Sequence, residues 1–289
     1  MMAKAADVLR ATAKFLVALV CVLLAASEVR AQGKVNAHYT ISMTGVTIGE
    51  INWRIDIGST LYSLVASGKA SGVLSVLMNG EGSVAAEGSI AADRLNPLSY
   101  KSTIADDDGT ITLQMTFADG AATEQITPRP PEHADRVPIT DDDRRGVADP
   151  LSAVLLPTKL GGGALAASDC DRTLKIYDGR RRYNLALSHG RLDKVTIERG
   201  YTGPALVCEV VLAPIAGYRA DSLIVKYVAG RRNMELWFAP IAGTSIMAPV
   251  RVLMPTLIGT LKIQANEFVA VAAPSMPAPV EASPLPPPQ

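Results

Sequence analysis

The chain has 289 residues, of which 48% are apolar and 5% aromatic, and its formal net charge is zero. This apolar fraction supports a sizeable core, and the length suits one large β domain or two small ones. A near-neutral chain argues against nucleic acid as the main partner, because that binding relies on basic side chains that neutralise phosphates.

Residues 1–31 have the features of a secretory signal peptide. Basic residues precede an apolar run of 12 residues at 15–26, and Val29-Arg30-Ala31 fits a cleavage site. The run is shorter than the roughly 20 residues of a membrane-spanning helix, although an uncleaved anchor is an alternative. We therefore expect a periplasmic or envelope-associated protein with no transmembrane helix after signal cleavage.

Short apolar-polar alternations separated by turn residues dominate the rest of the chain. Residues 35–43 and 46–57 flank Thr44-Gly45, and the alternation is nearly strict from 50 to 57, as a half-buried strand requires. Residues 106–108 precede Gly109 and are interpreted as a hairpin turn, since they lack the alternating acidic spacing of a calcium loop. No metal or cofactor is expected.

Residues 68–82 differ from these strands because apolar residues crowd between glycines with few charges. The segment either plugs one end of a sheet or forms a lip over an apolar cavity or a membrane-facing patch. The second interpretation makes it a ligand-binding lip formed by Val73, Leu74, Val76, Leu77 and Met78.

One short helix is predicted at residues 149–157. Asp149 can cap the first N–H groups, Pro150 suits the first helical position, and Pro157 stops the helix early.

Cys170 and Cys208 form an even pair that an oxidising compartment would join in a disulfide. A reactive thiol pair is the alternative, but there is no Cys-x-x-Cys motif and no adjacent histidine. Between them, residues 174–177, 183–188 and 192–198 are predicted as three strands of an antiparallel meander, with turns at Asp178-Gly179 and His189-Gly190.

Basic residues gather at predicted turns. One interpretation is that they keep hairpin tips soluble. The other is that two such turns meet at one sheet end and hold an anionic headgroup or a glycan carboxylate. The predicted contacts are Arg180, Arg181, Arg182, Arg231 and Arg232, and Arg144-Arg145 is a further basic turn.

Further strands follow Cys208, including one predicted at residues 222–228, and residues 270–289 form an Ala/Pro-rich tail expected to be disordered or polyproline-like. The strands show no βαβ alternation. The prediction is a single all-β domain at residues 35–268, built as a large curved antiparallel sheet or an incompletely closed β-barrel with one short helix.

The ordered chain resembles the exported bacterial family of unknown function DUF3108. The resemblance rests on the Tyr39 strand followed by Gly45 and Gly49, on the segment 96–100 (NPLSY), on the helix start 149–153 (DPLSA), and on the segments 235–238 (ELWF) and 248–251 (APVR). It implies export and a β-rich envelope protein, and it supplies no catalytic residues. By analogy of fold, such sheets are similar to envelope lipid and lipoprotein carriers.

The interpretation that follows is a non-catalytic envelope protein that binds an apolar or amphipathic ligand, such as a lipid, or an envelope partner. A hydrolase acting on envelope material is an alternative, and it would need a histidine beside Ser and Asp, or beside a second metal ligand, in one cleft. A scaffold or assembly factor that uses sheet edges and the proline-rich tail is a third possibility.

Overall fold

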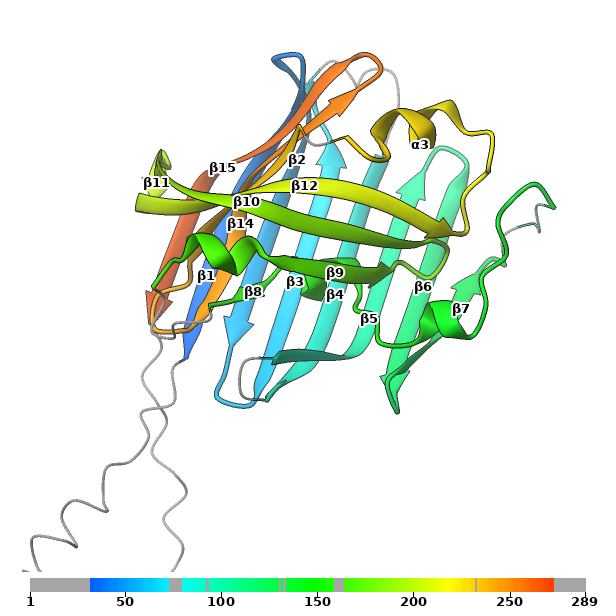
Figure 1. Ribbon diagram of the computed structural model, residues 1–289, viewed down its shortest axis with the longest axis horizontal. Helices are drawn as coiled ribbons and strands as arrows, with labels where there is room; N and C mark the ends of the chain where they lie inside the picture. Colours follow the sequence, from blue (N-terminus) through cyan, green and yellow to red (C-terminus); the bar gives the residue numbers. More distant parts are fainter. Residues whose placement is uncertain are drawn as a thin grey trace, which may run out of the picture. The chain divides into compact units, whose positions relative to one another are not determined.

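The structure is a computed structural model that describes residues 32–72, 80–91, 94–129, 131, 134–158, 164–231 and 233–272. These residues lie in the unit Ala31–Met276. Most of them belong to one large β-sheet (Figure 1). The five residues of the predicted lip, Arg232 and residues 273–289 of the predicted tail lie outside the described residues, whereas residues 270–272, also predicted as tail, belong to the last strand of the sheet.

Seven strands form a meander in the first half of the sheet: β1 (Gly33–Met43), β2 (Val46–Ile57), β3 (Leu61–Ala70), β4 (Gly80–Ala91), β5 (Arg94–Asp106), β6 (Gly109–Ala118) and β7 (Ala121–Thr127). The second half contains β8 (Leu156–Pro157), β9 (Arg172–Tyr177), β10 (Arg182–Thr196), β11 (Arg199–Gly200), β12 (Thr202–Ala216), β13 (Met234–Pro240), β14 (Ile246–Thr256) and β15 (Gly259–Ala272). The helical elements are α2 (Pro150–Ala153), α3 (Leu223–Val228) and the 3-10 helices η2 (Asp142–Arg144) and η3 (Ala167–Cys170).

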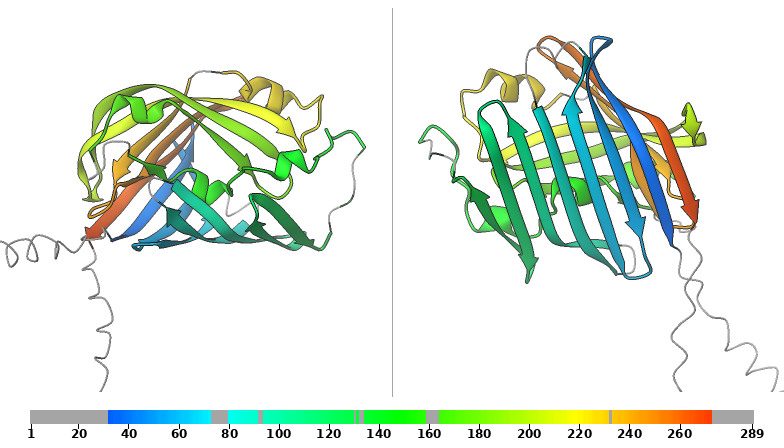
Figure 2. Two further views of the ribbon diagram at one scale, coloured as in Figure 1. Left: turned by 60° about the horizontal axis from the view of Figure 1, so that its bottom comes forward. Right: turned by 180° about the vertical axis from the view of Figure 1, so that it is seen from behind.

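The main path of the sheet runs β7-β6-β5-β4-β3-β2-β1-β15-β14-β13-β12-β10-β9. The pairing of β1 with β15 joins the two ends of the chain in the middle of this order. The sheet curls so that β9, β10 and β12 cross over the face made by the first seven strands (Figures 1 and 2). The predicted fold class is confirmed, because this curved antiparallel sheet is not closed by strand pairing between β7 and β9.

The connector between β7 and α2 links the two open edges of the sheet. Arg145 forms a bridge with Ala121, and the Gly146 N–H donates to the Gly120 carbonyl at 2.8 Å. On the other side, the Ala148 N–H donates to the Lys175 carbonyl at 2.9 Å, and its carbonyl accepts from the Tyr177 N–H at 3.0 Å. Arg145, Gly146 and Ala148 therefore bond to backbone groups at the two open edges, which strand pairing would satisfy in a closed barrel.

The core follows from alternation along the strands. Val35, Ala37 and Tyr39 of β1 are buried together with the alternate residues Trp53 and Ile55 of β2. They belong to the main cluster, which includes side chains from both halves of the sheet and fills the interior of the curl. A filled interior counts against a ligand held between the two faces of the sheet.

A second apolar cluster lies on the other side of β12 and β13. It contains Leu206 and Phe238 and is covered by η3 and α3 through Cys170 and Val228. The predicted disulfide is confirmed, with the Cys170 and Cys208 sulfurs 1.98 Å apart. The bond ties η3 to β12 inside this cluster.

The predicted helix start is also confirmed. Asp149 Oδ1 accepts hydrogen bonds from the Leu151 N–H at 3.0 Å and the Ser152 N–H at 2.9 Å, and α2 begins at Pro150.

Two local predictions were wrong. Residues 183–188 and 192–198 are not separate strands: residues 183–188 and 192–196 belong to the continuous strand β10, which has a bulge at His189-Gly190 and ends at Thr196. His189 has a φ of 50°, so the positive backbone angle that suggested a hairpin turn belongs to a bulge instead. The strand passes η3 closely there, because a Cβ at Gly190 would lie 2.1 Å from the Ala167 carbonyl oxygen.

Residues 222–228, predicted as a strand, form the helix α3. The Ser222 hydroxyl accepts a hydrogen bond from the Val225 N–H at 3.4 Å and caps the helix. Periodicity does not separate a helix from a strand in such a short apolar run.

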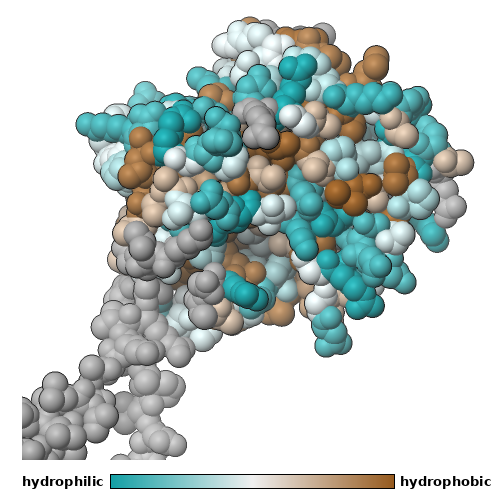
Figure 3. Space-filling model, in the orientation of Figure 1, coloured by the Kyte–Doolittle hydropathy of each residue, from teal (hydrophilic) through white to brown (hydrophobic). Residues whose placement is uncertain are grey.

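Among the described residues, no helix has the length and apolar character needed to cross a membrane. Apolar surface appears over α3 and the neighbouring hairpin tips (Figure 3).

Candidate functional site

A cavity of about 830 Å³ lies beside the end of β7, between the connector 129–144 and the turn that joins β9 to β10. Its polar lining consists mainly of arginines, three from the connector and one from the β9–β10 turn. Arg129, Arg136, Arg144 and Arg180 line it together with one acidic residue, Glu124. Apolar contacts come from Ile126, Val137 and Ile139.

The connector is held at this position by β-type hydrogen bonds to the chain that follows β12. The Val137 N–H donates to the Tyr218 carbonyl at 2.9 Å, and the Gly217 N–H donates to the Val137 carbonyl at 2.8 Å. The Arg136 Nη1 donates to the Gly217 carbonyl at 3.1 Å. Its Nε is shielded from solvent and has no hydrogen-bond partner within the described residues.

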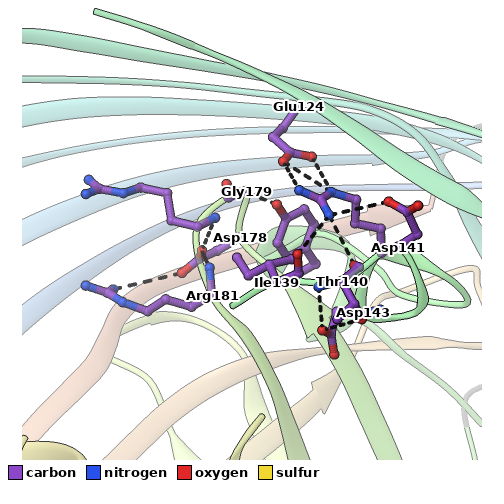
Figure 4. A network of polar contacts seen from close by, with 11 residues as sticks. Glu124, Ile139, Thr140, Asp141, Asp143, Asp178, Gly179 and Arg181 are labelled. Atoms are coloured by element: carbon purple, nitrogen blue, oxygen red, sulfur yellow. Dashed lines mark hydrogen bonds and ion pairs between the residues drawn. The ribbon is translucent and has the colours of Figure 1, made fainter. Parts of the chain in front are cut away.

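Arg144 is fixed by Glu124 in a two-pronged pair (Figure 4). Its Nε lies 3.1 Å from Oε2, and its Nη2 lies 2.7 Å from Oε1. The Nη1 group donates to the Thr140 carbonyl at 3.1 Å, and the guanidinium lies over the Tyr177 ring. The hydrogen bonds and charge of Glu124 raise the pKa of Arg144, so this side chain is a charged and rigid part of the cavity wall.

Asp178 stabilises the turn that positions Arg180, and Figure 4 shows Asp178 beside Gly179 and Arg181 of this turn. Asp178 Oδ1 accepts from the Arg180 N–H at 2.9 Å and from the Arg181 N–H at 2.7 Å. Gly179 has a φ of +83°, and a Cβ there would lie 2.5 Å from a Leu113 methyl carbon. Within the described residues, the Arg180 guanidinium makes no hydrogen bond or ion pair, so it is available to a ligand.

The other predicted anion contacts lie elsewhere. Arg181 interacts with Asp178 at 3.9 Å and lies over the Tyr218 ring. Arg182 is buried, donates to the Tyr183 carbonyl and the Asn184 side chain, and has its pKa lowered by burial. Arg231 lies over the Tyr227 ring beside α3. The structure therefore brings Arg180 together with Arg144 of another predicted basic turn, but not with Arg181, Arg182 or Arg231.

Sequence reasoning missed Arg129, Arg136 and Glu124. Arg129 and Arg136 lie in the polar, proline-rich segment that follows β7. The sequence shows only that Arg129 and Arg136 share one segment with Arg144. No local pattern indicates that this segment folds back over β7.

A second cavity, of about 940 Å³, lies on the other side of the linking connector. Gly146, Val147 and Ala148 line it, whereas Arg144 lines the first cavity. Its wall is more apolar and includes Leu95, Leu155 and Leu174, and the cations Arg94, Arg172 and Lys175 also line it.

The histidines do not form a nucleophilic site in the described residues. His38 Nδ1 lies 2.7 Å from Asn266 Oδ1, and its Nε2 lies 3.5 Å from Glu50. His189 Nδ1 faces both Ser188 Oγ at 2.9 Å and Glu209 at 3.4 Å. A relay needs the serine and the acid on opposite ring nitrogens, so this arrangement does not meet the requirement of the hydrolase alternative. His133 lies outside the described residues.

No group of three metal-ligating side chains comes together in the part of the chain that the structure describes. The Asp106 carboxylate accepts a hydrogen bond from the Asp108 N–H at 3.0 Å, and this contact stabilises the turn between β5 and β6.

The family model DUF3108, described as a protein of unknown function, matches residues 38–266. The chain belongs to the DUF3108 family. A search of curated proteins finds no match for this DUF3108 protein. Among solved structures, it is similar to a β-barrel-like protein of the domain of unknown function DUF1849 from Brucella abortus, with 8% identity and a TM-score of 0.46. That match covers 84% of this chain and 98% of the other.

Proposed function

We propose that this DUF3108 protein is an exported, envelope-associated protein that binds, without catalysis, an amphipathic ligand with an anionic group. The observation that carries the proposal is that three arginines of the connector and Arg180 of the β9–β10 turn line one cavity that also has an apolar wall. Positively charged side chains that lie close together repel one another and destabilise the folded chain, and an anionic ligand would offset that repulsion.

The two kinds of lining match the two parts of such a ligand. Guanidinium groups bind carboxylate and phosphate through paired N–H donors. Ile126, Val137 and Ile139 provide apolar contacts for the rest of the molecule. A volume of about 830 Å³ is in the range of small-molecule sites.

Arg144 and Arg180 have different roles in this proposal. Glu124 neutralises Arg144 and holds it in the wall, whereas Arg180 has no carboxylate partner within the described residues. Arg136 is anchored through Nη1 to a carbonyl, and no carboxylate of the described residues forms an ion pair with it. Arg136 and Arg180 therefore supply the attraction for the anionic group.

Export is part of the proposal and rests on the signal-like residues 1–31. The disulfide between Cys170 and Cys208 supports it, because such bonds persist in oxidising compartments. Because the interior is filled, we propose that the ligand binds in the cavity beside the end of β7 rather than between the faces of the sheet.

The test is calorimetric titration of the purified protein with dodecyl phosphate, and with dodecyl maltoside as a neutral amphiphile. We expect the phosphate to bind and Arg180→Gln or Arg136→Gln to weaken binding by about tenfold. Arg181→Gln is the matched control, since that side chain interacts with Asp178 outside the cavity lining. Absence of phosphate binding, or an equal loss in the control, would refute the proposal.

A further inference from the structure

Large apolar side chains gather at one end of the sheet without being covered. Val46 lies next to the β1–β2 turn, Leu257 and Ile258 form the β14–β15 turn, and Leu223 and Ile224 begin α3. Their exposed fractions range from 48% to 77%. These five residues are called the apolar rim below.

Contacts between the three elements place the rim residues near one another. The Thr44 N–H donates to the Thr260 carbonyl at 3.0 Å and joins the two turns. Tyr227 and Val228 of α3 pack in the same apolar cluster as Met254, which lies just before the β14–β15 turn. Figure 1 shows α3 and both turns at the same end, and Figure 3 shows brown apolar surface over this region.

The local structure holds these side chains outward. Thr256 Oγ1 accepts from the Ile258 N–H at 3.3 Å and donates to the Gly259 carbonyl at 2.7 Å, which fixes the turn. In α3, Val228 is buried against the second cluster, whereas Leu223 and Ile224 in the first turn are 74% and 67% exposed. Exposure of this kind is typical of an interaction surface.

The charges near the rim favour an anionic partner. Lys226 lies on α3, Arg231 is held over the Tyr227 ring, and Lys262 follows the β14–β15 turn. The nearest acidic residue in sequence, Asp221, interacts with Arg219 at 3.4 Å. The acidic turn at residues 106–108 lines one pocket with Ile41 of β1 and Ile48 of β2, so its carboxylates lie on the β1–β2 side of the rim.

We propose that the apolar rim docks the protein on a bilayer that contains anionic lipids. The apolar side chains enter the headgroup region, and Lys226, Arg231 and Lys262 contact the lipid phosphates. This surface is separate from the arginine-lined cavity and does not depend on its occupancy.

The experiment is vesicle co-sedimentation of the full chain, with vesicles of phosphatidylcholine alone or with added phosphatidylglycerol. The apolar run at residues 15–26 is itself attracted to bilayers, so every protein must carry the same N-terminus, verified by mass spectrometry. We expect binding to the anionic vesicles, weaker binding to the neutral ones, and a decrease with added salt.

Two double variants test the rim itself: Leu223→Ser with Ile224→Ser, and Leu257→Ser with Ile258→Ser. Each should reduce the partition coefficient by about tenfold or more. The matched control is Leu61→Ser with Leu192→Ser, since these side chains are 58% and 55% exposed outside the rim. Equal binding of rim and control variants would overturn the proposal. So would light scattering that shows a dimer dissociated by the rim substitutions, because the rim would then bind a second copy.

Discussion

At the scale of single residues, Asp149 combines complete burial with a structural role. It is fully buried, and Oδ1 caps α2 while Oδ2 has no hydrogen-bond partner in the described residues. Burial raises the pKa of the Asp149 carboxyl, because the charged form loses its hydration and the Ser152 and Leu151 donors compensate only in part.

Asp149→Asn should therefore change how stability depends on pH. A folded pKa above the unfolded value gives stability that is present at low pH and is lost as the pH rises through the folded pKa. When the pH falls from neutrality through the folded pKa of Asp149, the wild type should gain stability relative to Asp149→Asn. Urea unfolding at several pH values measures this difference. Parallel stability curves for the two proteins would contradict the expectation.

Asp149→Ala separates the cap from the charge. Alanine cannot accept the N–H groups of Leu151 and Ser152, so the free energy of unfolding should fall by about 1–2 kcal/mol relative to Asp149→Asn. The difference is measured at neutral pH in the same urea titrations. Equal stability of the two variants would show that the cap does not contribute.

Glu124→Gln should act on stability and on binding in opposite directions. The change removes the carboxylate that holds Arg144, so the free energy of unfolding should decrease by about 1–3 kcal/mol. The same change leaves the cavity more positive, and dodecyl phosphate should bind more tightly. Calorimetric titration and urea unfolding of one variant check both signs, and weaker phosphate binding would contradict the proposed role of the cavity.

At the scale of elements, tertiary contacts decided the conformation of β10. The strand continues through His189-Gly190 because the bulge accommodates η3, which the disulfide holds against β12. The same two residues would form a turn if only local preferences counted.

Gly190→Ala should be strongly destabilising, because the new methyl group would lie 2.1 Å from the Ala167 carbonyl oxygen. We expect a loss of about 1–3 kcal/mol in the free energy of unfolding. Gly80→Ala is the matched control in a strand, since a Cβ there has nothing within 4 Å. A similar loss in both variants would mean that the contact with η3 is not responsible.

At the scale of the whole molecule, the open sheet depends on the connector that links its edges. Residues 145–148 bond to the β6–β7 turn on one side and to β9 on the other, and a cavity lies on each side of this link. The arginine-lined cavity therefore exists only when both ends of the sheet are brought together, which makes it a product of the complete fold.

Several features of this DUF3108 protein are determined by short stretches of sequence. Alternation in β2, the cap at Asp149 and the pair Cys170 and Cys208 were sufficient for the fold class, α2 and the disulfide. The predicted anion contacts were not determined in this way: of Arg180, Arg181, Arg182 and Arg231, the four that the structure describes, only Arg180 lines the cavity. Strand periodicity and capping depend on neighbouring residues, whereas the cavity joins segments about 50 residues apart through the curl of the sheet. Only the tertiary structure decides such contacts, because no local preference encodes where a distant segment packs.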